Sequence, residues 1–203
     1  MEYPPRRPGD PNRSPAELME LFIRKAERED AIAVWDIRNA AILAQCTGHY
    51  PEEQLSAWTA GEMTDAFAET VARHWYVATV DGSVVGTGLL DCSTGQVDAI
   101  FVRPDRMGCG VGRAILAHLE CLAAKIGLRR LTLDSTLNAA PFYRQCGFVG
   151  DQRSVYESPR GISLACIPMV KQLVTSPIAG EQTDAGETSA SSSLKPKLTP
   201  RSP

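Results

Sequence analysis

The sequence has 203 residues, of which 43% are hydrophobic and 22% are charged. This composition is typical of a chain that folds around its own core, and it excludes fibrous, fully disordered and membrane-embedded proteins. Because the net charge is −3, no general positive field exists to attract nucleic acid or an anionic membrane surface, so any anion site has to be local.

The two ends of the sequence differ from its middle. Residues 1–16 are rich in proline and charge, and residues 175–203 are mostly Ser, Thr, Pro, Gly and Lys. Such segments have too little apolar surface to offset the entropy lost on ordering. We therefore expect a disordered N-terminal segment (1–16), one domain (17–174) and a disordered C-terminal tail (175–203). Since no signal-peptide pattern or membrane span is apparent, we expect a cytoplasmic protein.

The cysteines and histidines are dispersed, and no two cysteines form a C-x-x-C pair. This spacing favours free thiols and predicts no metal site.

The domain begins with a strand followed by two helical segments. Residues 21–26 (LFIRKA) favour a strand. From Asp30 onward, apolar residues recur at helical spacing and predict a helix that faces the core. Residues 51–71 favour one further helix, because Pro51 suits a helix start and two glutamates follow it. The predicted apolar positions of the first helix are Ile32, Val34, Ile37, Ala41, Ile42 and Leu43.

Three strands come next. Residues 75–80 (WYVATV) and 83–90 (SVVGTGLL) flank an Asp-Gly pair, which is typical of a tight hairpin. Residues 97–102 (VDAIFV) form a further strand after a short turn. The pattern predicts an antiparallel meander.

The second half of the domain returns to a strand-helix-strand order. From Gly110 to Gly127, apolar residues at helical spacing predict a helix that packs on a sheet. Residues 128–134 (LRRLTLD) then form a strand, which a right-handed crossover places parallel to residues 97–102. Residues 138–148 indicate one short helix, and residues 154–158 and 162–170 form a closing hairpin. The apolar face of the long helix is predicted to contain Val111, Ile115, Leu119, Leu122 and Ile126.

Three alternating glycines stand where the third meander strand passes into this helix. Gly108, Gly110 and Gly112 leave backbone N–H groups and the positive helix end free to face an anion, with phosphate the obvious ligand. A dinucleotide site uses the same physics, and Asp134 ends the following strand. Against that alternative, Arg113 occupies the place of the third glycine, and the sequence contains only one such crossover. The remaining alternative is that the glycines only make a tight connection.

Two stretches, VRPDRMGCGVGRAIL and STLNAAPFYRQCGF, resemble motifs of the GNAT superfamily of acyl-CoA-dependent N-acetyltransferases. The first is similar to the acyl-CoA signature Q/R-x-x-G-x-G/A after a V-x-P strand exit, and the second to the helix motif that ends in F-Y-x-x-x-G-F. The resemblance covers residues 20–172. It implies an α/β fold with a mixed, mostly antiparallel, splayed sheet of six to seven strands and about four flanking helices. It also implies transfer of an acetyl group from acetyl-CoA to a primary amine of a small molecule or protein, by direct attack in a ternary complex.

The resemblance also implies where the cofactor binds. Met107 occupies the Gln/Arg position of the signature, with Arg106 one residue early, and the backbone from Gly108 through Arg113 would contact the pyrophosphate. The frequent Asn of the later motif aligns with Thr136, and Asn138 falls two residues on. The implied cofactor contacts are Phe101, Val102, Met107, Gly108, Cys109, Gly110, Val111, Gly112, Arg113, Asn138 and Tyr143.

Catalytic roles follow from the same resemblance. Tyr143 matches the tyrosine that commonly protonates the departing CoA sulfur, and its ordinary pKa of about 10 keeps its proton at pH 7. An amine acceptor has to lose a proton, so a base is required. We expect Asp98 in that role, while Asp134, Glu157 and ordered water remain alternatives. The backbone N–H of Phe101 or Val102 would meet the oxyanion.

Other interpretations of these residues stay open. Tyr143 could simply pack between sheet and helix, and Asp98 could be an exposed strand position. His49 and Tyr50 lie in a loop that lines the acceptor cleft in similar proteins, where either could affect acceptor choice. An acyl-CoA-binding sensor without turnover is the functional alternative. Similar proteins often pair through their sheets, which leaves a homodimer open.

Overall fold

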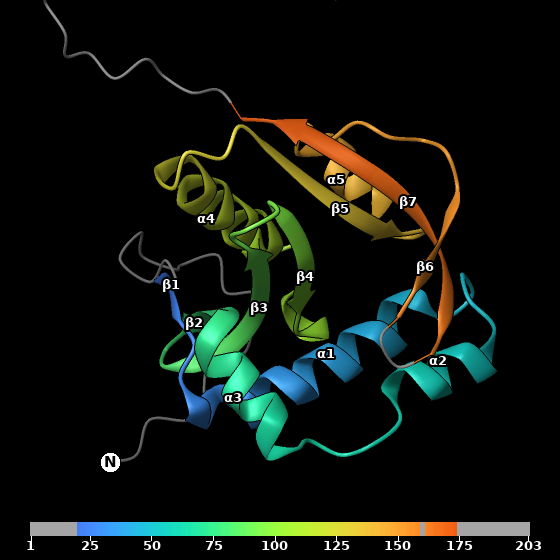
Figure 1. The fold of residues 1–203 in the computed structure, drawn as a ribbon. Coiled ribbons are helices and arrows are strands. Elements are labelled where there is room, and N and C mark those ends of the chain that lie inside the picture. The colour runs from blue at the N-terminus through green and yellow to red at the C-terminus, as the bar shows by residue number, and fades with distance from the viewer. Residues whose placement is uncertain (1–19, 159–160, 174–203) are drawn as a thin grey trace, which may run out of the picture.

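The computed structural model describes residues 20–158 and 161–173, so the segments expected to be disordered, 1–16 and 175–203, lie outside the described residues. Seven strands form one sheet in the order β1-β2-β3-β4-β5-β7-β6 (Figure 1). Only β4 and β5 pair in parallel, and all other described neighbours are antiparallel. The mixed, mostly antiparallel sheet is therefore confirmed. The strands are β1 (Leu21–Lys25), β2 (Trp75–Val80), β3 (Ser83–Asp91), β4 (Gln96–Val102), β5 (Arg130–Thr136), β6 (Ser154–Glu157) and β7 (Ser163–Gln172).

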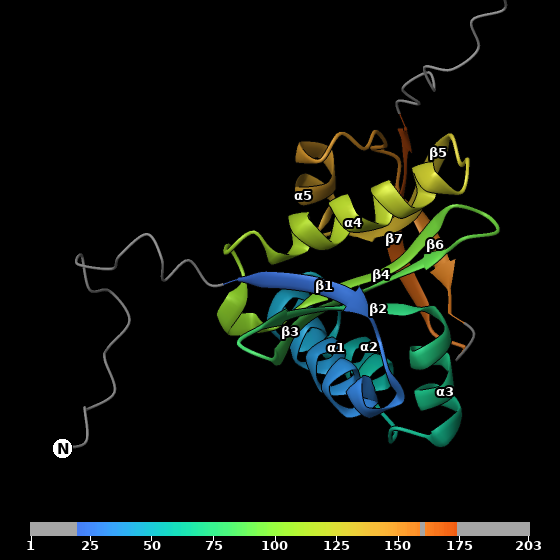
Figure 2. The same ribbon diagram turned by 90° about the vertical axis from the view of Figure 1, so that its left-hand side faces the viewer.

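Helices cover both faces of the sheet (Figure 2). α1, α2 and α3 lie on one face, and α4 and α5 lie on the other. None of the described helices is long and apolar enough to span a bilayer. The helices are α1 (Ala31–Cys46), α2 (Glu52–Thr59), α3 (Asp65–His74), α4 (Val111–Lys125) and α5 (Ala140–Gln145), with short 3-10 helices η2 (Arg28–Asp30) and η3 (Pro104–Arg106).

The prediction of one helix over residues 51–71 is wrong, because two helices, α2 and α3, occupy this region. Gly61 has a φ of 94°, outside the helical range. Thr64 then caps the second helix, since its hydroxyl accepts a hydrogen bond from the Phe67 N–H at 3.2 Å. The described part of the chain thus has five α-helices where about four were expected.

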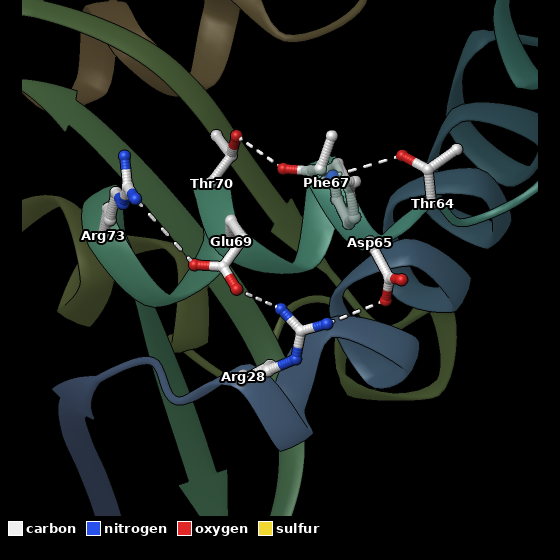
Figure 3. Close-up of polar contacts among 8 residues, drawn as sticks. Arg28, Thr64, Asp65, Phe67, Glu69, Thr70 and Arg73 are labelled. Atoms are coloured by element: carbon white, nitrogen blue, oxygen red, sulfur yellow. Dashed lines mark hydrogen bonds and ion pairs between the residues drawn. The ribbon is translucent and has the colours of Figure 1, made fainter.

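An ion-pair network fastens α3 to the segment after β1. The Arg28 guanidinium contacts Asp65 at 2.7 Å and also pairs with Glu69, which lies near Arg73 (Figure 3). These side chains are largely exposed, so each pair stabilises the fold by less than about 1 kcal/mol. Their role is to orient α3 rather than to hold the core together.

The buried faces of α1 and α4 are narrower than the apolar spacing predicts. Ile32 and Leu43 of α1 are 62% and 48% exposed, and Ile126, just after α4, is 48% exposed. The small residues Ala31 and Ala123 are buried in their helices instead. Spacing alone identifies the apolar stripe of a helix but not which edge of that stripe meets the sheet.

α4 lies unusually close to β3. A Cβ atom added at Gly88 would stand 2.5 Å from the Cγ2 of Ile115, and one at Gly86 would stand 2.8 Å from the Cγ1 of Val111. These glycines therefore set the distance between helix and sheet. Because Val111 is the first residue of α4, the same contact fixes the loop that precedes the helix.

β4 and β5 separate after a single paired position. Gln96 pairs with Thr132, and its side chain accepts a hydrogen bond from the Thr132 hydroxyl at 2.6 Å and donates one to Asp134 at 3.2 Å. Beyond this point the strands diverge, while β5 stays paired with β7 from Arg130 to Thr136 (Figure 1). The sheet is splayed, as the resemblance implied.

Replacing Gly88 by Ala tests the close contact. We expect the free energy of unfolding to fall by about 1–3 kcal/mol, because the added methyl group would overlap Ile115. Urea unfolding followed by circular dichroism measures the change. Gly112→Ala is the matched control, since its Cβ would meet Phe142 and Val102 at an ordinary 3.5 Å. Equal stability of Gly88→Ala and the wild type would contradict the assigned contact.

Candidate functional site

A cavity of about 280 Å³ opens where β4 and β5 separate. Residues of α1 and of the β6–β7 hairpin complete its walls. Among the residues expected to bind the cofactor or to act in catalysis, it is lined by Asp98, Phe101, Asn138 and Tyr143. The cavity therefore brings the expected acid and base to one place.

The glycine loop lies between β4 and α4. Gly108 and Gly110 have φ values of 74° and 84°, which glycine adopts without strain, and no atom lies within 4 Å of where their Cβ atoms would be. Among hydrogen bonds between described residues, none is donated by the N–H groups of Gly108, Gly110, Val111 or Gly112. These donors and the N-terminus of α4 form the local positive site that an anion requires.

The arginines near this loop have different surroundings. Arg103 makes two hydrogen bonds to the Asp105 carboxylate, at 2.6 and 3.0 Å. Arg106 lies 3.7 Å from the same residue. Arg113 is exposed in the first turn of α4, and Met107 is half-buried. Asp105 thus offsets one of the two positive charges of Arg103 and Arg106, and backbone N–H groups, the helix end and Arg113 add to the positive potential of the loop.

Tyr143 is buried in α5 and lines the cavity. Its ring packs edge-on between Phe142 and Phe148, with centroids 5.1 and 5.7 Å away. Burial raises the pKa of the Tyr143 hydroxyl well above its ordinary value, with a further contribution from Cys146. The hydroxyl therefore keeps its proton at neutral pH and can act as a donor.

Asp98 borders the cavity from β4 and remains exposed to solvent. Partial burial raises the pKa of its carboxyl, and the negative charges of Asp91 and Asp134 raise it further. A carboxylate with a raised pKa binds a proton more strongly, which suits a general base. Asp134 also lines the cavity, whereas Glu157 does not and accepts a hydrogen bond from Ser163 at 2.6 Å.

Backbone N–H groups alternate in direction along β4, and this alternation determines which of them face the gap between β4 and β5. The Arg103 N–H donates to Val85 of the β3 side at 2.9 Å. Because N–H groups alternate along an antiparallel pair, the Phe101 N–H also faces β3, and those of Ile100 and Val102 face β5. Of the two expected oxyanion donors, Val102 has the suitable direction and Phe101 does not. Ile100, which lines the cavity, is a donor that the sequence did not single out.

The acceptor-loop residues take different positions. His49 is exposed, and Tyr50 is buried behind the cavity wall, where its ring packs edge-on against Trp58. Neither lines the cavity, whereas Trp58, Arg38 and Tyr156 do. Local sequence gave no signal for these three, since they come from separate elements. The described residues contain no group of three or more His, Cys, Asp or Glu side chains arranged to hold a metal ion.

Comparison with known proteins identifies the family. Residues 72–150 match the model of the acetyltransferase (GNAT) domain. The crystal structure of a GCN5-related N-acetyltransferase from Rhodopseudomonas palustris is 33% identical to this chain, and the match covers 77% of this chain and 98% of that one, with a TM-score of 0.70. The chain belongs to the GNAT family of acetyl-CoA-dependent N-acetyltransferases.

Two curated relatives act on different amines. The aminoglycoside N(6′)-acetyltransferase type 1 of Stenotrophomonas maltophilia is 35% identical over 96 residues, which is 46% of this chain and 57% of that enzyme. The match thus spans little more than half of that relative. The peptidyl-lysine N-acetyltransferase YjaB of Escherichia coli is 28% identical over 141 residues, covering 67% of this chain and 87% of that protein. This GNAT protein is similar to both.

The alternative of a dinucleotide-binding fold is wrong for this GNAT protein. A doubly wound sheet is built mostly from parallel strands, and the described sheet has one parallel pair.

Replacing Gly110 by Val tests the glycine loop. A β-branched side chain would stand in the open space above the loop, and we expect the affinity for acetyl-CoA to fall at least about tenfold. Calorimetric titration with acetyl-CoA measures this change. Gly127→Val is the matched control, because Gly127 has nearly the same φ of 83° and equally open surroundings at the other end of α4. Unchanged affinity in Gly110→Val would remove the assignment of this loop to the phosphates.

Proposed function

We propose that this GNAT protein moves the acetyl group of acetyl-CoA to a cationic primary amine by direct attack in a ternary complex. The observation that carries the proposal is that Tyr143 and Asp98 line one cavity, at the point where β4 leaves β5. The glycine loop follows β4 directly along the chain. A phosphate-binding loop, unpaired strand backbone and a proton donor with a proton acceptor are the parts that this reaction needs.

The cofactor is proposed to extend from the glycine loop into the cavity. Its pyrophosphate binds the N–H groups from Gly108 through Arg113, with Met107 and Cys109 at the edge of the loop. The thioester end then passes between β4 and β5, beside Phe101, Val102 and Asn138. The cavity is lined by Phe101 and Asn138 but by none of the loop residues, so it forms the reaction end of the site.

We assign a residue to each step of the proposed transfer. Asp98 accepts a proton from the bound ammonium group, and the neutral nitrogen attacks the thioester carbon. The negative charge that develops on the carbonyl oxygen is stabilised by the N–H groups of Ile100 and Val102. As the C–S bond breaks, Tyr143 donates its proton to the sulfur, and the attacking nitrogen, which carries a positive charge after the C–N bond forms, loses its second proton to the tyrosinate and so restores the phenol. The products are the N-acetylated amine and free CoA thiol.

The charges around the cavity favour a cationic acceptor. Asp98 and Asp134 both line it. Arg38 is the one Lys or Arg among the described lining residues, and its guanidinium donates to Asn39 at 2.6 Å and to the Trp58 carbonyl at 3.0 Å. The two curated relatives are named for an aminoglycoside and for peptidyl-lysine, both of which carry ammonium groups. We therefore propose a polyamine, an aminoglycoside or a lysine side chain as the acceptor class.

Replacing Tyr143 by Phe tests the acid. We expect kcat to fall at least about 100-fold, the range for loss of a general acid, while the affinity for acetyl-CoA stays unchanged. Release of CoA thiol is measured with kanamycin, spermidine and a lysine-containing peptide as acceptors. Tyr76→Phe is the control, since it removes a hydroxyl from a tyrosine that does not line the cavity. A wild-type protein that binds acetyl-CoA and acetylates none of these amines would favour an acyl-CoA sensor instead.

Asp98 is tested through the pH dependence of kcat/KM. The carboxylate is the active form, so kcat/KM falls as the pH drops through the pKa of Asp98. That pKa is raised above the ordinary aspartate value of about 3.9. Asp98→Asn is expected to lower kcat/KM at least about 100-fold and to abolish this acid limb. Asp134→Asn removes a neighbouring negative charge, so the limb moves to lower pH. An acid limb that survives in Asp98→Asn would assign the base to another group or to water.

A further inference from the structure

Tyr50, in the loop after α1, forms hydrogen bonds with β7 and with the turn after β5. Its hydroxyl donates a hydrogen bond to the Ala165 carbonyl of β7 at 2.6 Å and accepts one from the Leu137 N–H, just after β5, at 3.0 Å. The residue is 7% exposed and packs in a cluster with α1, α2 and β7. One hydroxyl thus links the loop after α1 to two segments that are far from it in the sequence, β7 and the turn after β5.

The place of this hydroxyl in the sheet is specific. The last pair of the β5–β7 ladder is Thr136 with Cys166, so the next pair would join Leu137 to Ala165. The Tyr50 hydroxyl lies between the N–H of Leu137 and the carbonyl of Ala165, and each group bonds to it. The hydroxyl therefore replaces the rung at which β5 would otherwise continue along β7.

The end of this ladder determines where the next segment goes. After Leu137 the chain turns through Asn138 and enters α5, which carries Tyr143. A second contact from the same side supports the turn, because the Cys46 thiol lies 3.5 Å from the Asn138 side-chain oxygen. The segment that holds the proposed acid is thus fixed by residues at the end of α1 and just after it.

We propose that Tyr50 is a positioning residue for acetyl transfer, which holds the turn after β5 away from β7 and so places Tyr143 at the thioester. This inference rests on the proposed function, because it assigns Tyr143 as the acid. Without the hydroxyl, the Leu137 N–H and the Ala165 carbonyl can bond directly, which draws the turn toward β7. The ring of Tyr50 fills the core in either case.

Tyr50→Phe tests the inference, since it keeps the ring and removes only the hydroxyl. We expect kcat for spermidine, kanamycin or the lysine peptide to fall about tenfold, the effect of losing one well-placed buried hydrogen bond, with the dissociation constant of acetyl-CoA unchanged. Tyr76→Phe is again the matched control and keeps the wild-type kcat. The proposal is overturned if Tyr50→Phe leaves kcat unchanged, or if it lowers the affinity for acetyl-CoA by as large a factor as kcat.

A double mutant separates positioning from a general loss of structure. If Tyr50 acts through Tyr143, then Tyr50→Phe causes no further loss of kcat in a Tyr143→Phe background. A tenfold loss in both backgrounds would show that Tyr50 acts elsewhere and would overturn the inference.

A measurement that needs no turnover keeps this inference distinct from the proposed function. In amide NMR spectra of the full chain, Tyr50→Phe is expected to shift the signals of Leu137, Asn138 and Tyr143 and to leave those of β2 and β3 in place. Unchanged signals at these three residues overturn the proposal even if the enzyme is active. If the wild type acetylates none of the amines, the proposed function fails, and these spectra alone decide whether Tyr50 positions the turn.

Discussion

The early separation of β4 from β5 is the constraint on which the rest of the site depends. A buried backbone group without a partner costs about 1–3 kcal/mol, so adjacent strands normally pair along their length. Here Gln96 forms the last link, with its own amide bridging to Thr132 and Asp134. Everything proposed for the chemistry uses what lies beyond this link, namely the cavity and the strand N–H groups that face it. In the proposed reaction, a ligand carbonyl would supply the missing acceptor and offset the free energy that the sheet loses where the strands do not pair.

The glycine loop is placed correctly only because α4 is held close to the sheet. Gly86 and Gly88 bring the first turns of α4 against β3, the strand next to β4. A larger residue at either position would push the helix outward and carry the loop away from the end of β4. Glycines thus have two different roles here: absent side chains in β3 set the distance of the helix, and left-handed backbone in the loop exposes its N–H groups.

Local chemistry made parts of this structure predictable. Asp81 and Gly82 both have positive φ values, as a tight two-residue hairpin requires, and the Asp-Gly pair in the sequence predicts that turn. The glycine loop and the α5 motif are likewise contiguous.

Features that depend on how separate helices and strands come together in space could not be predicted from local sequence. The direction of the Ile100 N–H follows from which neighbour β4 pairs with, and Trp58 lines the same cavity as Asp98 only because α2 packs against α1. The break between α2 and α3 was not predicted, because the helix start at Pro51 favoured one continuous helix and the second start at Thr64 was not considered.

Full burial at Tyr143 and partial burial at Asp98, which remains exposed to solvent, affect the proposed acid and base in opposite ways. Burial raises the pKa of both Tyr143 and Asp98. For a phenol this secures the proton that has to be donated, whereas for a carboxylate it strengthens the attraction for a proton that has to be removed. An incoming ammonium group would partly reverse the shift at Asp98, because its positive charge stabilises the carboxylate beside Asp134. The cationic acceptor would therefore help to generate the ionised base that deprotonates it, and a neutral ligand in the same cavity would not.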